Sequence, residues 1–351
     1  MNDTLVLIPT YKPDDNLLDI AARLFSAGFR ILVADDGSGD AYSDILEKLS
    51  AYATVIGYDD RRGRGFAIKY GLDVVLEQMS YFKYLIIADQ TCTFTALDVN
   101  SVSEAVHKDG GIVVGARDLK RDIGILSRIY NGFMRTVYSL MTGVYVTDVM
   151  SGLRAFEMKY LRFLMDVEGD GLDYETNVII EAAKRRFPIT TIKNNSRSME
   201  LRARKSVSLN MRKDVLPCVK SLFFAAWPSL GAMMLNFAVM LAVAIIAGKG
   251  YASVAAGVFL GSIVGIAASV FLNNRVGYEE NFDGALSYNR IMMGMLRFCL
   301  YLLFMEFFGV LLGIGIFLAL IITVLFTMVI EMFVMREGLD KDLRLQAQSE
   351  K

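Results

Sequence analysis

The 351-residue chain contains one histidine and three cysteines, and this scarcity excludes several kinds of site. A single histidine, His107, argues against metal centres and catalytic triads built on histidine. Cys92, Cys218 and Cys299 are so widely spaced that they indicate neither a disulfide framework nor a zinc site. The formal net charge is only −1, so there is no overall basic field of the kind that attracts nucleic acid.

The N-terminus lacks a basic segment followed by a long apolar run. It begins MNDTLVLIPTYKPDD, which does not have the features of a secretory signal peptide. We therefore expect the first part of the chain to fold in the cytoplasm.

Apolar residues are abundant but unevenly distributed. They make up 54% of the sequence, and the mean hydropathy is +0.40. Residues 1–213 carry most of the charge, whereas four apolar windows follow, each about as long as the 20 residues that a bilayer crossing needs. The windows are 222–247, 252–272, 293–312 and 314–335. They predict an all-α, four-helix transmembrane domain at 214–338 and a cytoplasmic tail at 339–351; buried helices of a large soluble core are the alternative.

Basic residues beside these windows predict the orientation in the membrane. Arg212 and Lys213 precede the first window, Arg275 and Arg290 lie between the second and third, and Arg336 follows the fourth. Basic residues next to a span favour the cytoplasmic side, so four crossings place both termini in the cytoplasm. We predict a multi-pass protein of the cell membrane whose first domain faces the cytoplasm.

Residues 1–213 alternate between apolar strands and amphipathic helices. TLVLIP (4–9), RILVADDGS (30–38) and KYLIIAD (83–89) are typical of buried strands, and 16–28 and 42–53 are typical of helices. This rhythm predicts a mostly parallel, doubly wound α/β sheet. Ligands of such sheets lie beyond the carboxyl ends of the strands. The candidate residues there are Pro9, Thr10, Asp35, Asp36, Asp89 and Arg117.

Two of these strand ends carry patterns with a chemical meaning. Asp35 and Asp36 precede a Gly-Ser turn, where carboxylates can accept hydrogen bonds from a nucleotide; a simple Asp-Gly turn is the alternative. RRGRG (61–65) places glycines and arginines ahead of a predicted helix. Backbone amides at a helix start and guanidinium groups both suit a diphosphate, and a solvated basic loop is the alternative.

Seven stretches, in order along the chain, resemble the motifs of glycosyltransferase family 2. They are IPTYKPD (8–14), ADDGS (34–38), RRGRGFAIKYG (61–71), IIADQT (86–91), GAR (115–117), SRIYN (127–131) and TDVMSGLRAF (147–156). The last stretch is similar to that of the polyprenyl-phosphate and dolichyl-phosphate sugar synthases. The four windows, with FLNNRVGY (271–278), resemble a GtrA-like membrane domain. The resemblance implies a Rossmann-like GT-A domain with a mostly parallel sheet over residues 1–213.

What the resemblance implies is an enzyme that moves a hexose from a nucleotide-sugar, UDP- or GDP-linked, to undecaprenyl or dolichyl phosphate. It implies catalytic roles for Asp89 and Asp148, although Asp148 also fits a helix N-cap. The residues it assigns to the nucleotide-sugar are Pro9, Thr10, Tyr11, Asp35, Asp36, Gly63, Gly65, Asp89, Arg202 and Lys205. Those assigned to the acceptor phosphate are Arg117, Arg128 and Asn131. Membrane lipids are further expected partners, and a homo-oligomer is left open.

The family's metal-binding Asp-x-Asp pattern is incomplete. Asp89 is followed by Gln90 and Thr91, and the acid that the family carries late in the domain corresponds to Asn177, with Glu175 nearby. A threonine hydroxyl is a poorer ligand for Mg²⁺ or Mn²⁺ than a carboxylate, so we predict weak metal binding at Asp89 and Thr91. The alternatives are a non-catalytic relative that binds nucleotide-sugar or lipid, and a glycosyltransferase with another lipid acceptor.

Overall fold

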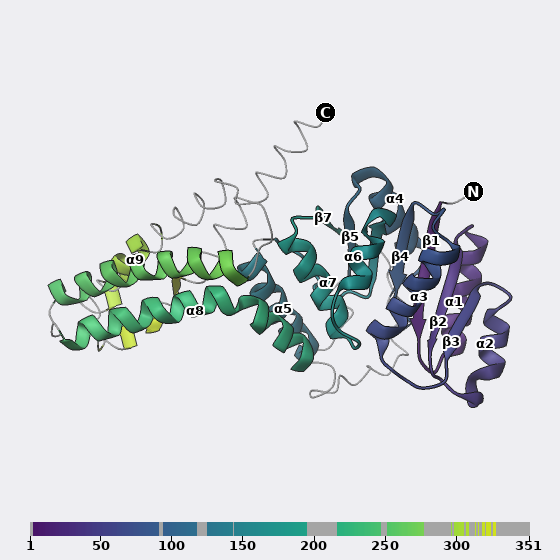
Figure 1. Ribbon diagram of the computed structural model, residues 1–351, viewed down its shortest axis with the longest axis horizontal. Helices are drawn as coiled ribbons and strands as arrows, with labels where there is room; N and C mark the ends of the chain where they lie inside the picture. The colour runs from purple at the N-terminus through teal and green to yellow at the C-terminus, as the bar shows by residue number, and fades with distance from the viewer. Residues whose placement is uncertain are drawn as a thin grey trace. The chain divides into compact units, whose positions relative to one another are not determined.

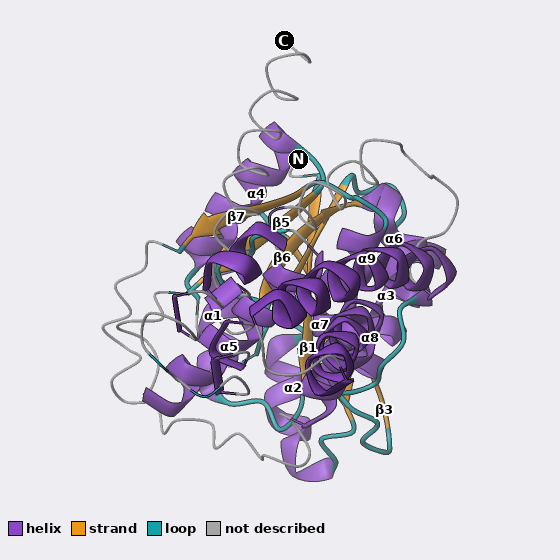
Figure 2. Ribbon diagram, turned by 90° about the vertical axis from the view of Figure 1, so that its left-hand side faces the viewer, coloured by secondary structure: helices purple, strands orange, loops and turns teal. Residues whose placement is uncertain are grey.

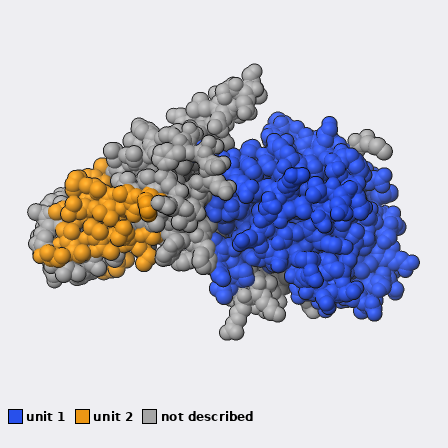
Figure 3. Space-filling view, viewed as in Figure 1, with its two compact units in different colours: residues 1–138, 145–222 blue, residues 139–144, 223–351 orange. Residues whose placement is uncertain are grey.

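The chain forms two compact units. The computed structural model describes residues 3–90, 94–117, 125–142, 144–194, 216–246 and 251–276, together with scattered residues between 296 and 327. One unit comprises 1–138 and 145–222, and the other comprises 139–144 and 223–351 (Figure 3).

The first unit is built on a seven-stranded sheet with the order β3-β2-β1-β4-β6-β5-β7 (Figure 1). The strands are β1 (Thr4–Thr10), β2 (Arg30–Asp36), β3 (Thr54–Tyr58), β4 (Tyr84–Ala88), β5 (Ile112–Ala116), β6 (Leu153–Glu157) and β7 (Ile189–Lys193). Strand β6 runs antiparallel to both of its neighbours, and the other adjacent pairs are parallel. The predicted mostly parallel α/β sheet is confirmed.

Helices join these strands and continue beyond them. They are α1 (Asp15–Ser26), α2 (Ser43–Leu49), α3 (Arg64–Gln78), α4 (Ala96–Asp109), α5 (Ile125–Thr142), α6 (Leu161–Asp166), α7 (Asp173–Lys184), α8 (Leu216–Ile246) and α9 (Tyr251–Val276), with short 3-10 turns at Asp40–Tyr42 and Met158–Tyr160. Figure 2 distinguishes the strands, in orange, from the helices, in purple.

Both faces of the sheet are covered, which explains the continuous apolar strands. Leu5 and Leu7 of β1 pack with α3, α6 and α7, whereas Val6 and Ile8 pack with α1, α2 and α4. Side chains alternate between the two faces of a strand, so a sheet buried on both sides favours runs of consecutive apolar residues in its strands. This three-layer packing leaves the carboxyl edge as the place where polar side chains gather.

Helix α1 illustrates how the local sequence sets these elements. The Asp14 carboxylate accepts a hydrogen bond from Leu17 N at 3.2 Å and caps the helix, a contact worth about 1 kcal/mol. Leu17, Ala21 and Leu24 are buried at helical spacing. Gly28 follows the helix at φ 87°, a backbone conformation that is common just after a helix ends. The helix predicted at 16–28 is confirmed, with the bounds Asp15–Ser26.

In the second unit, glycines of α9 allow close contact with α8. A Cβ at Gly261 would lie 2.8 Å from Asn236 Oδ1, and one at Gly265 would lie 2.7 Å from Asn236 Cβ. Gly257 faces Met240 in the same way, one helical turn earlier. Glycines spaced four apart remove the side chains that would otherwise hold two helices apart. These two helices therefore form a tight hairpin.

Two of the four predicted spans correspond to described helices. The windows 222–247 and 252–272 fall on α8 and α9. Within the part of the chain that the structure describes, no helix combines the length and the apolar character needed to cross a membrane. The windows 293–312 and 314–335 lie largely outside the described residues. The four-span domain stays a prediction.

Candidate active site

The predicted site residues that are described lie mostly at the carboxyl edge of the sheet. Asp36 ends β2, Asp89 directly follows β4, and Arg117 directly follows β5. Thr10, the last residue of β1, is paired in register with Asp35 of β2. Pro9 is buried within β1, one residue earlier.

Gln90 joins the ends of β1 and β4. Its side-chain oxygen accepts hydrogen bonds from the Thr10 hydroxyl and from Tyr11 N, the latter at 2.6 Å, and its Nε2 donates to Tyr11 O at 2.8 Å. A side-chain amide that bonds both polar groups of one residue fixes the backbone there. Sequence reasoning treated Gln90 only as the spacer in a metal motif and missed this role.

Tyr11 presents an aromatic ring flanked by positive charge. The Arg61 guanidinium carbon lies 4.2 Å from the ring centroid, and Lys12 Nζ lies 5.2 Å from it. Cations close to an aromatic face are attracted by its quadrupole. Lys12 itself has a φ of 54°, which is uncommon for a residue with a side chain. The first strand therefore ends in a constrained turn beside a cationic aromatic surface.

Asp35 stabilises the turn that follows β2, and an Asp-Gly turn was the alternative interpretation of the motif ADDGS. Its carboxylate accepts hydrogen bonds from the Ser38 hydroxyl and from Ser38 N, the latter at 3.1 Å. The Ser38 hydroxyl in turn accepts a hydrogen bond from Lys12 N at 2.7 Å. Asp35 thus stabilises the chain that follows both β2 and β1, and its predicted contact with a nucleotide stays a prediction.

Asp36 organises the glycine-rich loop. Its Oδ1 accepts hydrogen bonds from Tyr58 Oη at 2.7 Å, Arg62 N at 2.8 Å and Gly63 N at 2.9 Å. The side chain is nearly fully buried. Burial raises the pKa of Tyr58, and the hydrogen bond to Asp36 and its negative charge raise it further. The carboxylate is therefore committed to contacts within the protein.

The glycines of RRGRG allow close packing, and their amides are engaged inside the protein. Gly65 N and Phe66 N donate to Asp170 O at 2.8 and 3.2 Å, and Gly63 N donates to Asp36. A Cβ at Gly65 would lie 2.6 Å from Tyr174 Cβ. In this conformation the amides of Gly63 and Gly65 already have acceptors within the protein. The assignment of Gly63 and Gly65 to the donor stays a prediction.

Arg64, the first residue of α3, bridges two acids. Its Nη1 donates to Asp89 Oδ1 at 2.8 Å, and its Nη2 donates to Glu175 Oε1 at 3.0 Å. Burial acts to lower the pKa of Arg64, but the charges of Asp89 and Glu175 and their hydrogen bonds raise it above its ordinary value. Arg64 therefore stays charged, and it holds the predicted catalytic Asp89 in place.

Gly152 fixes the other side of Asp89. A Cβ at this position would lie 2.6 Å from Asp89 Cβ, so any other residue would push the acid away. Sequence reasoning placed Gly152 in a family signature without a role. The structure shows that it leaves room for Asp89 next to the start of β6.

Asp148 forms a fork-shaped ion pair with Arg117. Arg117 Nε donates to Asp148 Oδ2 at 2.7 Å, and Arg117 Nη2 donates to Asp148 Oδ1 at 2.9 Å. Asp148 is fully buried, whereas 18% of the Arg117 side chain is exposed. Burial acts to lower the pKa of Arg117, but hydrogen bonding and charge from Asp148 raise it overall. In this conformation Asp148 positions Arg117 and is not open to a sugar, so its predicted catalytic role stays a prediction.

Arg154 of β6 is a buried cation beneath these pairs. Its Nε donates to Ser151 O and its Nη2 to Val149 O, both at 3.0 Å, and its Nη1 donates to Glu175 O. Burial lowers its pKa, partly opposed by the charges of Glu175 and Asp148. Arg154 thereby ties β6 to the segment before it and to α7.

We call the resulting group the charged cluster. It consists of Asp89, Asp148, Glu175, Arg64, Arg117 and Arg154. Its three acids and three arginines cancel in formal charge. Glu175 belongs to it, whereas Asn177, two residues later on α7, donates to Glu168 O at 2.9 Å. Residues two apart on a helix point in different directions. Glu175 therefore supplies the carboxylate at this site, and the side chain of Asn177 points elsewhere.

The remaining predicted site residues lie on α5 or outside the described residues. Arg128 is exposed and Asn131 is buried, both on α5. Thr91, Arg202 and Lys205 lie outside the described residues. The assignments of Arg117, Arg128 and Asn131 to an acceptor phosphate therefore stay predictions.

The described donor set does not favour a resident divalent cation, and Thr91, the second predicted ligand, lies outside the described residues. In the described part of the chain, no group of three or more histidine, cysteine or acidic side chains could hold a metal ion. Asp89 supplies a carboxylate, but its Oδ1 is bonded to Arg64. Mg²⁺ and Mn²⁺ prefer several oxygen ligands around one ion, and a guanidinium group beside Asp89 repels a second cation.

Comparisons with known proteins point to one enzyme class. Residues 5–162 match the family described as glycosyl transferase family 2. The glycosyltransferase AglJ of Haloferax volcanii is 26% identical over 192 residues, covering 53% of this chain and 60% of that protein. The polyprenol monophosphomannose synthase of Mycolicibacterium smegmatis is 24% identical over 226 residues, covering 60% of this chain and 83% of that protein. Both relatives match only a little more than half of this chain, and the chain spans 60% of the length of AglJ.

A solved structure also shows partial similarity. The glucosyl-3-phosphoglycerate synthase of Mycobacterium tuberculosis, solved with Mn²⁺ and UDP-glucose, is 16% identical, with a TM-score of 0.45. The match covers 62% of this chain and 79% of that chain.

Proposed function

We propose, on the premise that this chain carries a glycosyltransferase family 2 domain, that the protein transfers a hexose from a nucleotide-sugar to a polyprenyl phosphate. The product would be a lipid-linked monosaccharide. The acceptor class is suggested by the relative named polyprenol monophosphomannose synthase and by TDVMSGLRAF (147–156).

The observation that carries this proposal is the charged cluster at the carboxyl edge. Arg64 and Arg117 are held there by Asp89, Glu175 and Asp148, and both keep part of their side chains exposed. A reaction between a nucleotide-sugar and a lipid phosphate brings two anions together. Fixed guanidinium groups suit that demand because they match phosphate oxygens in a fork geometry.

The chemistry needs little proton transfer. A phosphate oxygen of the acceptor forms a bond to the anomeric carbon of the sugar, and the bond from that carbon to the nucleoside diphosphate breaks. The acceptor is already anionic, so no strong base is required. The protein's tasks are to orient the two anions and to stabilise the charge on the leaving diphosphate. Tyr11, beside Arg61, offers an aromatic surface on which the nucleobase can stack.

We propose a membrane location from the sequence. The four apolar windows would anchor residues 214–338 as a GtrA-like, multi-pass domain in the cell membrane. Both termini and the glycosyltransferase domain would face the cytoplasm, where a polyprenyl phosphate in the membrane surface is within reach. Self-association is a further property to be measured.

Metal dependence is the part of the family pattern that this chain supports least. Mg²⁺ or Mn²⁺ would be bound weakly through Asp89 and Thr91, and the described donor set does not favour it. The mechanism above therefore uses no metal-dependent step.

The test is transfer of radiolabelled sugar from UDP-, GDP- and dTDP-sugars to undecaprenyl phosphate by the purified full chain. Asp89→Asn is the site variant, and Asp73→Asn, an exposed acid on α3, is the matched control. We expect label in the lipid with the wild type and with Asp73→Asn, and a loss of about a hundredfold or more with Asp89→Asn.

A second candidate is a non-catalytic protein that binds nucleotide-sugar. The bond between Arg64 and Asp89, together with Thr91, favours it, because Asp89 is already occupied. Binding of a donor without transfer to any polyprenyl phosphate or glycolipid would support this candidate and contradict the proposed reaction. Transfer to a glycolipid alone would instead replace the acceptor.

A further inference from the structure

The position of Arg64 is unusual for a residue of a glycine-rich loop. Its guanidinium group lies between Asp89, which follows β4, and Glu175, in the first turn of α7. The exposed fractions of the three side chains are 14%, 22% and 12%. A cation is therefore built into the carboxyl edge between two acids from different elements.

This cation lies where a divalent ion would need to bind. A metal at Asp89 would take its carboxylate oxygens at about 2.0–2.2 Å, and Arg64 Nη1 already bonds one of them at 2.8 Å. A second acid, Glu175, is bonded to the same guanidinium group. Two acids that would otherwise serve as ligands are thus used to hold an arginine.

The formal charges of the side chains in the charged cluster sum to zero, as do those of two acids with one divalent ion. Two acids and one divalent ion are neutral together. Asp89 and Glu175 with Arg64 and the buried Arg154 are neutral as well, and Arg154 is close enough to Arg64 and Glu175 for their charges to act on one another. The Asp148 pair with Arg117 adds no net charge. The protein's own side chains therefore provide the positive charge that a metal would bring.

Arg64 also has a hydrogen-bond donor with no acceptor among the described residues. Its Nε is buried and has no hydrogen-bond partner among the described residues. Buried N–H groups without an acceptor are rare and costly, and a guanidinium group carries five donors. An anion that reached this side chain would find a charged donor with spare capacity.

We propose that Arg64 takes the place of the divalent cation and binds the diphosphate of the donor directly, so that donor binding does not require metal. The inference rests on the proposed function only for the identity of the donor. Asp89 and Glu175 act as positioning residues that keep the guanidinium charged and oriented.

The test is binding of UDP and of GDP to the full-length protein, measured by calorimetry in EDTA and again with Mn²⁺. For the wild type we expect affinity for at least one nucleotide in EDTA, changed by less than about threefold on adding Mn²⁺. Arg64→Gln should weaken binding in EDTA by about tenfold to a hundredfold, the range expected for one lost charged hydrogen bond. Arg23→Gln, an exposed arginine on α1, should leave binding unchanged.

Two further variants separate this role from a folding defect. Arg64→Lys keeps the charge but not the fork, so it should bind in EDTA with an affinity between wild type and Arg64→Gln. Glu175→Gln keeps a side-chain oxygen that can accept the hydrogen bond from Arg64 Nη2, so the guanidinium group stays oriented, but it removes a negative charge near the diphosphate. Binding in EDTA should therefore stay equal or become tighter. In a metal-dependent site the same change would remove a ligand and weaken binding in Mn²⁺.

The proposal is overturned if wild-type binding is lost in EDTA and restored by Mn²⁺, if Arg64→Gln binds as the wild type does, or if neither nucleotide binds under either condition. Metal-free binding that depends on Arg64, combined with no sugar transfer to lipid, would contradict the proposed reaction alone.

Discussion

The two halves of the carboxyl edge neutralise their acids in different ways. After β2, the hydrogen bonds to Asp36 come from a tyrosine hydroxyl and two backbone amides, and the exposed Arg61 is a distant ion-pair partner, with its Nε 3.7 Å from Asp36 Oδ2. After β4 and β5, Asp89 and Asp148 are held by the guanidinium groups of Arg64 and Arg117. Amides and hydroxyls fix a loop but bring no net charge, whereas guanidinium groups bring charge that an anion can use. The first half therefore holds its buried acid mainly through hydrogen bonds that fix a loop, whereas the second half holds its acids through guanidinium groups that are themselves mostly buried.

Breaking the buried pair in the second half should have the largest effect. Asp148→Asn leaves Arg117 without its charge partner in a site where Asp148 is fully buried. Loss of one member of a buried pair costs about 3–5 kcal/mol, and the low end applies because Arg117 keeps some exposure. We expect the thermal midpoint to fall by roughly 10 °C in a scanning fluorimetry measurement.

The double variant Asp148→Asn with Arg117→Gln sharpens this prediction. It removes both charges, so it should be less damaging than Asp148→Asn alone. Equal destabilisation by the single and double variants would mean that the pair contributes shape and not charge, and the contrast between the two halves would fail.

The corresponding change in the first half should cost less. Asp36→Asn keeps an oxygen acceptor but loses the charge that Tyr58, Arg62 and Gly63 share, a loss of about 2 kcal/mol. It should also lower the pKa of Tyr58, because burial raises that pKa first and Asp36 raises it further. Absorbance of tyrosinate during alkaline titration measures the change. A Tyr58 pKa that does not move would show that burial alone sets it.

A hydroxyl in the first half gives a smaller effect. Ser38→Ala removes the acceptor for Lys12 N, at 2.7 Å, and a donor to Asp35. We expect a loss of about 1 kcal/mol, or roughly 2–4 °C in the thermal midpoint, because the turn at Lys12 loses support. Ser26→Ala, an exposed serine at the end of α1, is the control and should change the midpoint by less than about 2 °C. Equal shifts of the thermal midpoint in Ser38→Ala and Ser26→Ala would show that the Ser38 hydroxyl does not stabilise this turn.

The sequence predicts the sheet well because apolar runs such as those of β1 and β4 are local signals. It also predicts which residues reach the carboxyl edge, since parallel strands place their ends together. It does not predict the partners of those residues. Arg64 and Glu175 are 111 positions apart, and nothing near either residue indicates the contact. The sequence also does not show which backbone amides a carboxylate will bind. Asp36 therefore resembles a ligand-binding acid in the sequence, although the structure shows that it binds the amides of Arg62 and Gly63.

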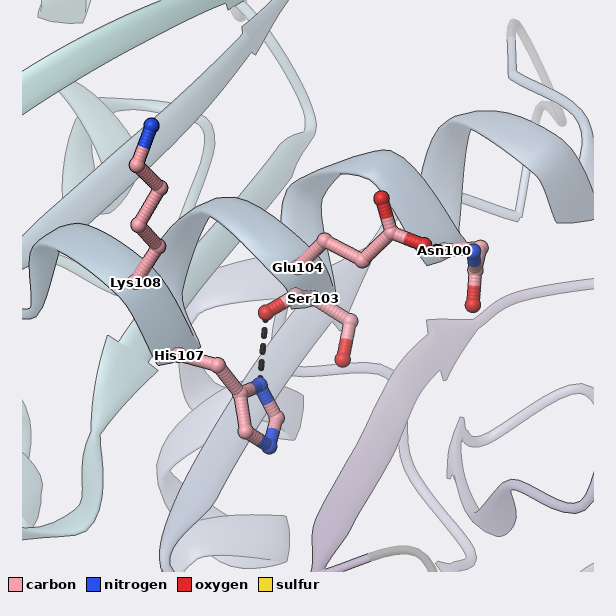
Figure 4. A pocket seen from close by; sticks show the side chains of 5 residues that line it. All are labelled: Asn100, Ser103, Glu104, His107 and Lys108. Carbon is pink, nitrogen blue, oxygen red and sulfur yellow. Dashed lines mark hydrogen bonds between the residues drawn. The ribbon is translucent and has the colours of Figure 1, made fainter.

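Asp3, a partly exposed acid at the amino end of β1, should give the smallest loss of stability among the acids compared. Asp3 precedes β1 and accepts a hydrogen bond from His107 Nε2 at 2.8 Å, while His107 Nδ1 lies 2.6 Å from Ser103 O (Figure 4). The imidazole ring also lies 3.9 Å from the ring of Tyr84, between centroids. Both ring nitrogens of His107 thus lie within hydrogen-bonding distance of an oxygen atom.

The pair should nevertheless contribute the least, and with a defined pH dependence. The hydrogen bond from His107 lowers the pKa of Asp3, although burial opposes it. A lowered folded pKa means that the stabilisation is present above the unfolded value, about 3.9, and is lost as the pH falls through the folded pKa. Because both side chains are 36% exposed, Asp3→Asn should cost less than about 1 kcal/mol at pH 7. Thermal midpoints of wild type and Asp3→Asn should differ at pH 7 and converge in acid. A difference in thermal midpoint that stays constant with pH would show that the contact acts through packing. A decrease as large as that of Asp148→Asn would show that burial does not explain why the two acids differ in their contribution to stability.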